Sequence, residues 1–222
     1  MSWEKKIAEL ELRRRWAEGL GGEESVKRHH ERGCLTVRER IAGVTDEGSF
    51  QEIGKLAGKG SYSQNNELLK VNPSSYVMGL AKLDGRPIAI GGEDYTVRGG
   101  VISGSERRKG GRGSFIEDIA YEYRIPLVNL IDGAGGTVES IRTRGFTAFP
   151  GSGPKGFERS VELLSQVPVV CAVMGTAASS SAARAVLGHW SVMVKNSSQI
   201  FAAGPPIVER ASGEKSTKEE LL

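Results

Sequence analysis

The sequence predicts an α/β domain in which two buried strands each end in a loop of small residues. Residues 125–131 form a short apolar run, the pattern of a strand covered on both faces, and the run stops at Asp132 before three glycines within four residues. Residues 168–174 repeat the apolar pattern, and Gly175 is expected to end that strand before the small residues 176–183 and a helix. Because glycine leaves backbone N–H groups open to a ligand, we expect the two loops to meet at one site.

A helical arm is expected at the amino-terminal end. Residues 1–20 have the pattern of an amphipathic helix that packs against the body or a neighbouring subunit. The apolar face of this helix consists of Trp3, Ile7, Leu10 and Ala17. We expect residues 1–45 to form the arm and residues 46–222 to form the domain.

Two shorter helices complete the arm. Residues 23–32 are charged, and the adjacent His29 and His30 point in different directions, so both are expected to be solvated rather than to bind a metal. Thr36, with Glu39 three residues later, is a capping box that opens the next helix.

Short strands are predicted in the first half of the domain. The Gly, Ser and Asn content of residues 58–66 indicates a mobile polar loop. Residues 76–83 and 87–90 form a β-hairpin around an Asp-Gly turn, and residues 94–97 are expected to continue the edge of the sheet. Further along the chain, two helices over residues 114–123 and 157–166 lead into the two buried strands.

Composition sets wider bounds. The 222 residues carry 30 Lys and Arg against 27 Asp and Glu, a net charge of +3 that does not indicate nucleic acid as a partner. Cys34 and Cys171 are the two cysteines, so a disulfide framework is not expected, and a reducing cytosol or organelle matrix fits. The sequence shows no signal peptide and no apolar run of membrane-spanning length, which predicts a soluble protein.

The sequence offers few side chains for catalysis but many glycines near the two loops. The sequence has no Ser/His/Asp grouping near a nucleophile elbow, no metal-ligand spacing and no evident pair of buried carboxylates. His189 and Glu139 are the side chains near the two loops that could act as general acid or base. Chemistry in which the protein contributes mainly backbone amide donors therefore fits best, although a glycine pair also serves as a simple tight turn.

Five further segments, read with the two loops, carry a family resemblance. They are LTVRERI (35–41), DEGSFQE (46–52), DGRPIAI (84–90), EDYTVRGG (93–100) and SQIFAAGPPIV (198–208). From about Gly21 to the end, the chain resembles the carboxyltransferase (beta) subunit of biotin-dependent acyl-CoA carboxylases, a family that includes the propionyl-CoA and methylcrotonoyl-CoA carboxylases. The resemblance implies a crotonase-like fold of repeated ββα units, coenzyme A thioester substrates and stabilisation of an oxyanion by backbone amides.

The resemblance also implies roles for particular residues. The N–H groups of Gly135 and Gly136 are expected to meet the thioester oxygen and stabilise the enolate that attacks CO2 released from carboxybiotin. Further donors are expected from the helix-start loop at Ser180, Ser181 and Ala182. No metal is expected.

A basic loop is the expected site for the coenzyme A phosphates. Arg108 and Lys109 stand where the family carries basic residues after its Gly-Gly pair, here Gly99 and Gly100. A solvated basic loop without a ligand is the alternative interpretation. The long irregular segment 140–154 is expected to border the acyl pocket.

Two departures from the family pattern bear on function. Ser180 and Ser181 replace a Gly-Gly pair, and each Cβ narrows the approach to the backbone. Family chains carry a second crotonase-like domain, which supplies the carboxybiotin half of the site from a neighbouring subunit and which we expect to be absent here. The chain alone is therefore expected to be inactive and to associate through exposed apolar surface.

Three functions remain open at this stage. The first is the acyl-CoA-binding half of a carboxyltransferase that needs a biotin carboxyl carrier, a biotin carboxylase subunit and a second domain, and that forms a homo-oligomer in the cytoplasm or mitochondrial matrix. The second is a stand-alone crotonase-like hydratase, isomerase or decarboxylase that uses His189 or Glu139 as base. The third is a non-catalytic assembly subunit. The sequence does not specify the acyl group.

Overall fold

The computed structural model describes residues 3–102, 109–111, 113–135, 156–217 and 220. Four of the predictions above fall on other residues. Those on Arg108, Gly136, Glu139 and the segment 140–154 lie outside the described part of the chain.

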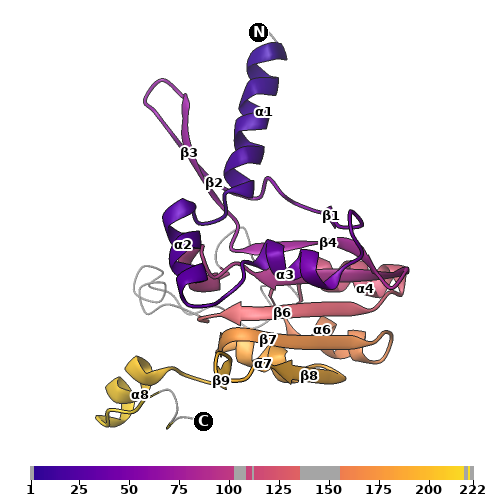
Figure 1. Cartoon of the computed structure of the whole chain (residues 1–222), viewed down its shortest axis with the longest axis vertical. Coiled ribbons are helices and arrows are strands. Elements are labelled where there is room, and N and C mark those ends of the chain that lie inside the picture. The colour runs from indigo at the N-terminus through magenta and orange to yellow at the C-terminus, as the bar shows by residue number, and fades with distance from the viewer. Residues whose placement is uncertain (1–2, 103–108, 112, 136–155, 218–219, 221–222) are drawn as a thin grey trace.

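A seven-stranded mixed sheet forms the centre of the described fold, with the order β1-β4-β5-β6-β7-β8 and with β9 paired to β7 (Figure 1). β4 and β5 are antiparallel, whereas β5, β6, β7 and β8 run parallel. The strands are β1 Gln51–Glu52, β4 Tyr76–Leu83, β5 Arg86–Glu93, β6 Leu127–Gly133, β7 Val169–Ala178, β8 Trp190–Met193 and β9 Gln199–Phe201.

Helices cover both faces of this sheet. On one face, α4 (Phe115–Tyr123), α6 (Phe157–Leu164) and α7 (Ser180–Val186) share a core with β6 and β7. On the other face, α3 (Val37–Val44) shares a second core with β4, β5 and β6. β6 contributes apolar side chains to both cores, which confirms the prediction of a strand covered on both faces.

The helix α3 packs on the sheet. Its Val37 and Ile41 are fully buried against the sheet. The capping box at its start is confirmed, because Thr36 N donates to Glu39 Oε2 at 2.7 Å and Glu39 N donates to Thr36 Oγ1 at 3.3 Å. The last of the three predicted arm helices is therefore in contact with the sheet, and the predicted boundary at residue 45 stays a prediction.

The helix α1 (Trp3–Glu18) and the hairpin of β2 (Gly58–Tyr62) and β3 (Leu68–Pro73) project together from the body (Figure 1). Arg13 Nη2 donates to Tyr62 Oη at 2.6 Å, which ties the two elements together. The hairpin corrects the prediction of a polar loop over residues 58–66. Its alternating Gly and polar residues suit a strand exposed on both sides.

The predicted apolar face of α1 is not buried along its length. Trp3 is 81% exposed and Ile7 is 56% exposed, whereas Ala17 is buried near the carboxyl end of the helix. The helix itself is confirmed. The first half of this face does not pack on the body of the same chain, and its packing on a neighbouring subunit, the other predicted arrangement, stays a prediction.

His29, on α2 (Glu23–Glu31), lies in the interior, which corrects the expectation that both histidines are solvated. Its ring stacks on Tyr95 with centroids 5.8 Å apart, and its Nε2 lies 3.1 Å from the carbonyl oxygen of Leu35. His30 is exposed, as predicted. Adjacent helical residues point in different directions, and here one of the two directions leads into the body.

The β4–β5 hairpin confirms the predicted Asp-Gly turn. Asp84 and Gly85 both have positive φ, at 49° and 76°, as the favoured two-residue hairpin turn requires. Asp46 accepts hydrogen bonds from both of their N–H groups, at 2.9 and 2.8 Å. Residues 94–97 do not continue the sheet, because β5 ends at Glu93 and the chain turns into the short 3₁₀ helix η1 (Arg98–Gly100).

The other predicted helices and both cysteines have simple outcomes. The two helices expected before the buried strands are confirmed as α4 and α6, and α8 (Pro205–Ser212) follows the last strand. Cys34 and Cys171 are both free thiols. Within the described ranges, none of the helices combines the length and apolar character needed to cross a bilayer.

Candidate functional site

The strand β7 is longer than predicted, because it passes through Gly175 in a bulge. Ile131 pairs with Val173, but the next paired position of β6, Gly133, pairs with Ala177. β7 thus uses four residues where β6 uses two, and it continues to Ala178. The prediction that Gly175 ends the strand is therefore wrong.

The bulge depends on Gly175 because the side chain of Asp132 occupies the space beside it. A Cβ on Gly175 would lie only 2.3 Å from Asp132 Oδ1. The extra residues of β7 bring its end level with the loop that follows β6.

The ends of β6 and β7 meet in a group of small residues, here called the strand-end cluster. It consists of Gly99, Gly100, Gly133, Ala134, Gly135, Ala178, Ser179, Ser180 and Ser181. A Cβ on Gly135 would lie 2.8 Å from Ala178 O, and a Cβ on Gly133 would lie 2.7 Å from Ser181 Oγ. The loops are therefore packed against each other, as the two sequence patterns together predicted.

The segment η1 closes the third side of the cluster. Ala134 N donates to Gly99 O at 2.9 Å. A Cβ on Gly100 would lie 2.3 Å from Asp132 O, so only glycine fits there. Gly99 and Gly100 both have positive φ, at 64° and 69°.

Part of the strand-end cluster lies at the surface. Ala134, Ser179 and Ser180 are exposed and Gly135 is half-buried, whereas Ser181 and Ala182 are buried. Ser180 to Ala182 form the first turn of α7, whose N–H groups have no acceptor within the helix by geometry. Small residues at the surface of a strand end leave room for an oxygen atom of a ligand to approach the main chain.

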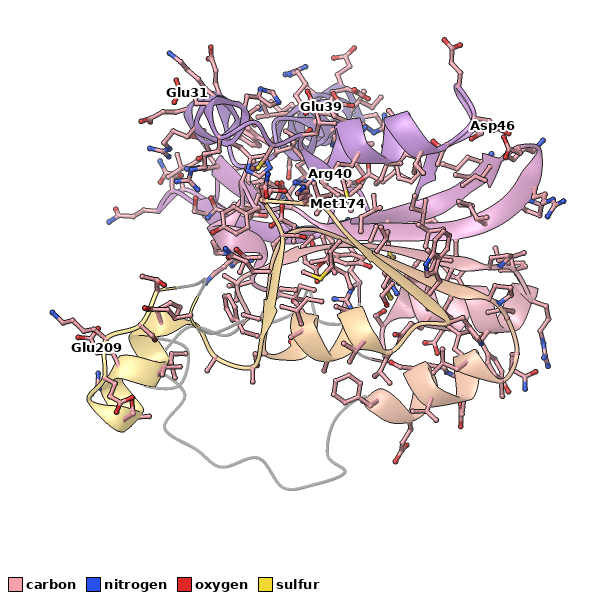
Figure 2. All side chains as sticks on the ribbon, turned by 60° about the horizontal axis from the view of Figure 1, so that its bottom comes forward. Glu31, Glu39, Arg40, Asp46, Met174 and Glu209 are labelled. Atoms are coloured by element: carbon pink, nitrogen blue, oxygen red, sulfur yellow. The ribbon has the colours of Figure 1, made fainter. Side chains whose placement is uncertain are left out.

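Two buried ion pairs lie directly beneath the cluster. Arg40 Nη1 on α3 lies 2.7 Å from Asp132 Oδ2 at the end of β6, and Arg184 Nη1 on α7 lies 2.5 Å from Glu93 Oε1 at the end of β5. All four side chains are at most 4% exposed. Figure 2 shows Arg40 in the interior, whereas Asp46 and Glu209 lie at the periphery.

The low polarity around these pairs shifts the pKa of individual groups. Burial raises the pKa of Asp132, although the neighbouring Arg40 favours its ionised form. Burial is the largest single influence on Arg184 and lowers its pKa, but Glu93, Tyr76 and Glu117 together outweigh burial and raise that pKa, so the guanidinium stays charged.

These four charged residues were not predicted from the sequence, although it contains one signal for them. Glu93 and Asp132 each stand at the end of an apolar strand. A carboxylate in such a position must be paired when it is buried, but its partners come from helices about 90 residues away in the sequence. The sequence pattern of a single strand therefore does not identify an arginine partner about 90 residues away.

Lys109 lies inside the body, away from the solvent. It is 6% exposed, and its Nζ lies 3.9 Å from Glu52 Oε1 on β1. Its aliphatic part contacts Gly54, where a Cβ would lie 3.4 Å from Lys109 Cε. The charge of Lys109 therefore faces a carboxylate of the protein in this structure, and its expected role toward phosphates stays a prediction.

His189 stands at the opposite end of β7 from the strand-end cluster. Its Nδ1 accepts a hydrogen bond from Val169 N at 3.0 Å, at the first residue of the strand. The ten residues of β7 span about 30 Å, so His189 is too far from Ala178 to act as a base at the cluster. Its expected nearness to both loops is wrong.

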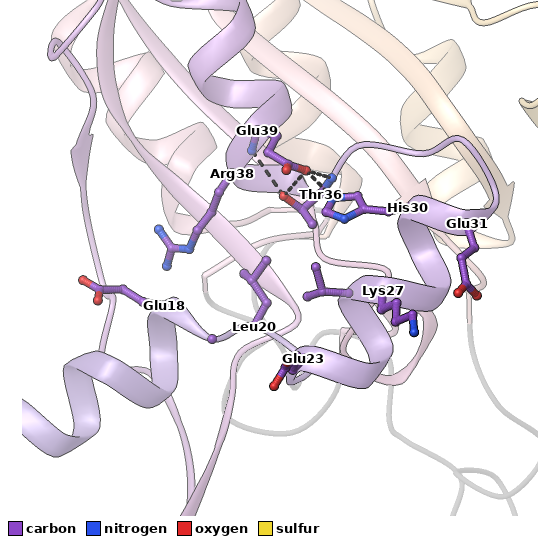
Figure 3. A pocket seen from close by; sticks show the side chains of 11 residues that line it. Glu18, Leu20, Glu23, Lys27, His30, Glu31, Thr36, Arg38 and Glu39 are labelled. Carbon is purple, nitrogen blue, oxygen red and sulfur yellow. Dashed lines mark hydrogen bonds and ion pairs between the residues drawn. The ribbon is translucent and has the colours of Figure 1, made fainter.

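An open groove of about 890 Å³ lies elsewhere, between the end of α1, α2 and α3 (Figure 3). None of the residues that line it belongs to the strand-end cluster. Within it, Glu39 Oε2 lies 2.9 Å from His30 Nε2 and accepts hydrogen bonds from both the N–H and the hydroxyl of Thr36. The hydrogen bond from His30 is the largest cause that lowers the pKa of Glu39 to about 2.

Replacing His30 by alanine is expected to move the pKa of Glu39 from about 2 toward its ordinary value of 4.5. Because the folded-state pKa of Glu39 is depressed, its contribution to stability is present above pH 4.5 and is lost as the pH falls toward 2. A carboxyl ¹³C NMR titration measures the midpoint. Lys27→Ala, at another residue that lines the groove, serves as control, and an unchanged midpoint in His30→Ala would contradict the assignment.

Comparisons with known proteins give a consistent result. Over 221 residues the chain is 29% identical to the propionyl-CoA carboxylase carboxyltransferase subunit of Haloferax mediterranei, covering 100% of this chain and 41% of that protein. Over 217 residues it is 31% identical to a biotin-dependent acetyl-/propionyl-coenzyme A carboxylase beta5 subunit of Mycobacterium tuberculosis, covering 97% of this chain and 38% of that protein. The chain thus spans about two fifths of the length of these relatives.

A solved structure shows the same fold. The transcarboxylase 12S hexamer core, crystallised with hydrolysed methylmalonyl-coenzyme A bound, superposes with a TM-score of 0.76 at 24% identity, over 99% of this chain and 41% of that one. The expected crotonase-like fold is confirmed. Residues 28–222 match the family described as the carboxyl transferase domain, and the chain therefore belongs to that family.

Proposed function

We propose that the chain is the acyl-CoA-binding half of a biotin-dependent carboxyltransferase, which moves a carboxyl group from carboxybiotin to the α-carbon of an acyl-CoA. The observation that carries this proposal is the strand-end cluster, in which Gly135 packs against Ala178 and Ser179. The loops that follow β6 and β7 have small side chains, and their backbones lie next to each other in this cluster. Membership of the carboxyl transferase domain family supports the reaction class.

The chain's own residues bind and polarise the thioester in this proposal. The N–H groups at Gly135 and Gly136 bind the thioester oxygen, and the first turn of α7 from Ser180 to Ala182 supplies further donors. An oxyanion is stabilised more strongly than a neutral carbonyl, so these donors lower the barrier to forming the enolate. One such donor contributes about 3 kcal/mol of transition-state stabilisation.

The serine pair that replaces two glycines is compatible with this role. Ser181 directs its hydroxyl inward, where Oγ donates to Glu93 Oε1 at 3.3 Å, and its side chain therefore points away from the surface. Ser180 is exposed and keeps its backbone N–H. The cluster thus retains a cradle of small residues that fits a carbonyl group.

Other groups complete the proposed reaction. The carboxybiotin supplies the carboxyl group and is carried by a separate biotin carboxyl carrier, while a second carboxyltransferase domain or subunit provides the residues that hold it. Arg108 is proposed to attract the phosphates of coenzyme A, and Gly99 and Gly100, which precede it in the sequence, are proposed to contribute to the same binding site. The proposed assembly is a homo-oligomer with a biotin carboxylase subunit, in the cytoplasm or the mitochondrial matrix.

Replacing Gly135 by alanine is expected to weaken the binding of propionyl-CoA about ten-fold or more. The added Cβ would lie 2.8 Å from Ala178 O and 2.9 Å from Ser179 Cβ, at a residue with φ of 78°, so the two loops must separate. Isothermal titration calorimetry with propionyl-CoA measures the effect.

Gly48→Ala is the matched control, because Gly48 has a similar φ of 68° and nothing lies within 4 Å of an added Cβ. Equal affinities of the Gly135→Ala and Gly48→Ala variants would remove the cluster from the binding site. No binding of propionyl-CoA to the unmodified chain would count against the proposed function itself. Crotonyl-CoA hydration by the chain without biotin would favour the alternative of a stand-alone crotonase-like enzyme.

A further inference from the structure

Glu93 is the last residue of β5, the strand between β4 and β6, and its side chain is 0% exposed. Space around it is limited. A Cβ on Gly100 would lie 3.1 Å from Glu93 Cβ, and a Cβ on Gly133 would lie 3.2 Å from Glu93 Cγ. The carboxylate therefore lies directly below the strand-end cluster, in contact with the backbone that forms it.

The two oxygens of Glu93 bind different elements. Oε2 accepts a hydrogen bond from Asp132 N, at the end of β6, at 3.3 Å. Oε1 accepts from Ser181 Oγ at 3.3 Å and from Arg184 Nη1 at 2.5 Å, both on α7. One side chain thus joins the end of β6 to the first turn of α7.

The contact with α7 fixes the direction of the helix as well as its distance. Ser181 and Arg184 are three residues apart, so they lie on the same face of the helix. The Arg184 guanidinium is held further by the ring of Tyr76, whose centroid is 5.8 Å from Cζ. Because charge-assisted hydrogen bonds are about twice as strong as neutral ones, this arrangement resists rotation of α7 against the sheet.

We propose that Glu93 is a positioning residue, which sets the separation of the β6 end and the first turn of α7 and thereby the geometry in which their backbone amides meet an acyl-CoA carbonyl. The ligand part of this inference rests on the proposed function. The positioning part rests on the contacts of Glu93 alone and is testable without any ligand.

The experiment compares two double variants that lack the same ion pair. Glu93→Gln with Arg184→Met keeps an acceptor oxygen for Asp132 N or Ser181 Oγ, whereas Glu93→Met with Arg184→Met keeps none. Neither variant leaves Glu93 or Arg184 as a buried charge without the other, and the replacements are similar in volume. The buried Glu117, whose charge also interacts with Arg184, keeps its hydrogen bonds from Ser160 and Ser114 in both variants, so both are expected to fold. Amide hydrogen exchange followed by NMR reports on the Asp132 N–H and on the first turn of α7, and calorimetry with propionyl-CoA reports on binding.

The Met/Met variant is expected to exchange the Asp132 amide about ten-fold faster than the Gln/Met variant and to bind propionyl-CoA about ten-fold more weakly. Ion pairing that serves stability alone would make the two variants alike in exchange and binding, and that result would overturn the proposal. Equal exchange with unequal binding would also overturn it, because the loops would then not have moved.

Ser160→Ala supplies the control, since Ser160 Oγ donates to another buried carboxylate, Glu117, at 2.8 Å. It is expected to leave exchange of the Asp132 amide unchanged; acceleration equal to that in the Met/Met variant would assign the effect to general loosening and overturn the proposal. If propionyl-CoA does not bind the unmodified chain, the proposed function fails. The exchange comparison still decides the role of Glu93 in that case.

Discussion

Replacing Arg40 by alanine is expected to lower the free energy of unfolding by about 3 to 5 kcal/mol. The guanidinium of Arg40 lies 2.7 Å from the Asp132 carboxylate, and both side chains are at most 4% exposed. Its removal leaves Asp132 charged in the interior without a partner. Chemical denaturation at pH 8 measures the change.

The effect of this substitution is expected to depend on pH. The folded state already holds the proton of Asp132 to a higher pH than the unfolded state, whose reference pKa is 3.8, because burial raises the pKa of Asp132. Its contribution to stability is therefore greatest below 3.8 and is lost as the pH rises through the folded-state pKa. Without Arg40 that pKa rises further, so the variant is expected to lose less stability at pH 5 than at pH 8.

Arg28→Ala is the control for this experiment, because Arg28 pairs with Glu24 on the surface, with side-chain exposures of 57% and 85%. Removal of this exposed pair is expected to change stability by less than about 1 kcal/mol. A loss in Arg40→Ala no larger than that of the control would show that the Arg40 pair is not needed to hold α3 on the sheet.

Replacing Gly100 by alanine is expected to cost about 3 kcal/mol of stability or more and to disrupt the strand-end cluster. Two penalties add at this position. A φ of 69° is unfavourable for a residue with a Cβ, and the Cβ would lie 2.3 Å from the carbonyl oxygen of Asp132. That oxygen belongs to the backbone, so it moves only if the end of β6 moves.

Gly99 provides a matched control one residue earlier. It has a similar φ of 64°, but a Cβ there would lie 3.5 Å from Ala134 Cβ, which is an ordinary contact. Gly99→Ala therefore carries the conformational penalty without the clash, and it is expected to cost about 1 kcal/mol. Urea denaturation of both variants separates the two penalties, and equal losses would show that the close approach to Asp132 O does not contribute.

Much of the fold could be predicted because its signals are local. The apolar run at 125–131 indicated a strand with two covered faces, and β6 has them. The capping box at Thr36 and the Asp-Gly turn at 84 and 85 act over three or four residues, and both have the predicted geometry.

The errors arose where distant parts of the chain decide the outcome. The bulge in β7 requires glycine at position 175 because the Asp132 side chain, from another strand, occupies the space where a Cβ would lie. His29 is buried because Tyr95, 66 positions away by residue number, offers a ring for stacking. The charged and polar residues near His29 in the sequence predicted that it is exposed to solvent. Such a local pattern does not reveal a packing partner from another segment.

The candidate site was predictable in outline only. The sequence indicated that Gly135 and the residues around Ser181 would meet, and the described structure places them in contact through Ala178, Ser179 and Gly133. Their catalytic role stays a prediction. The ion pairs of Glu93, Arg184 and Arg40 could not be predicted, because the two partners in each pair lie about 90 residues apart and no short motif contains both.

The two ion pairs beneath the strand-end cluster have a consequence for the order of events during synthesis. Arg40 and Asp132 are 92 residues apart, and Glu93 and Arg184 are 91 apart. During synthesis, Arg40 and Glu93 emerge from the ribosome about 90 residues before their partners. Contacts between residues so far apart in the sequence form late and slowly. The strand-end cluster therefore forms only after residue 184 has been synthesised, so a chain released before that point would present the loop after β6 without the turn of α7 that packs against it.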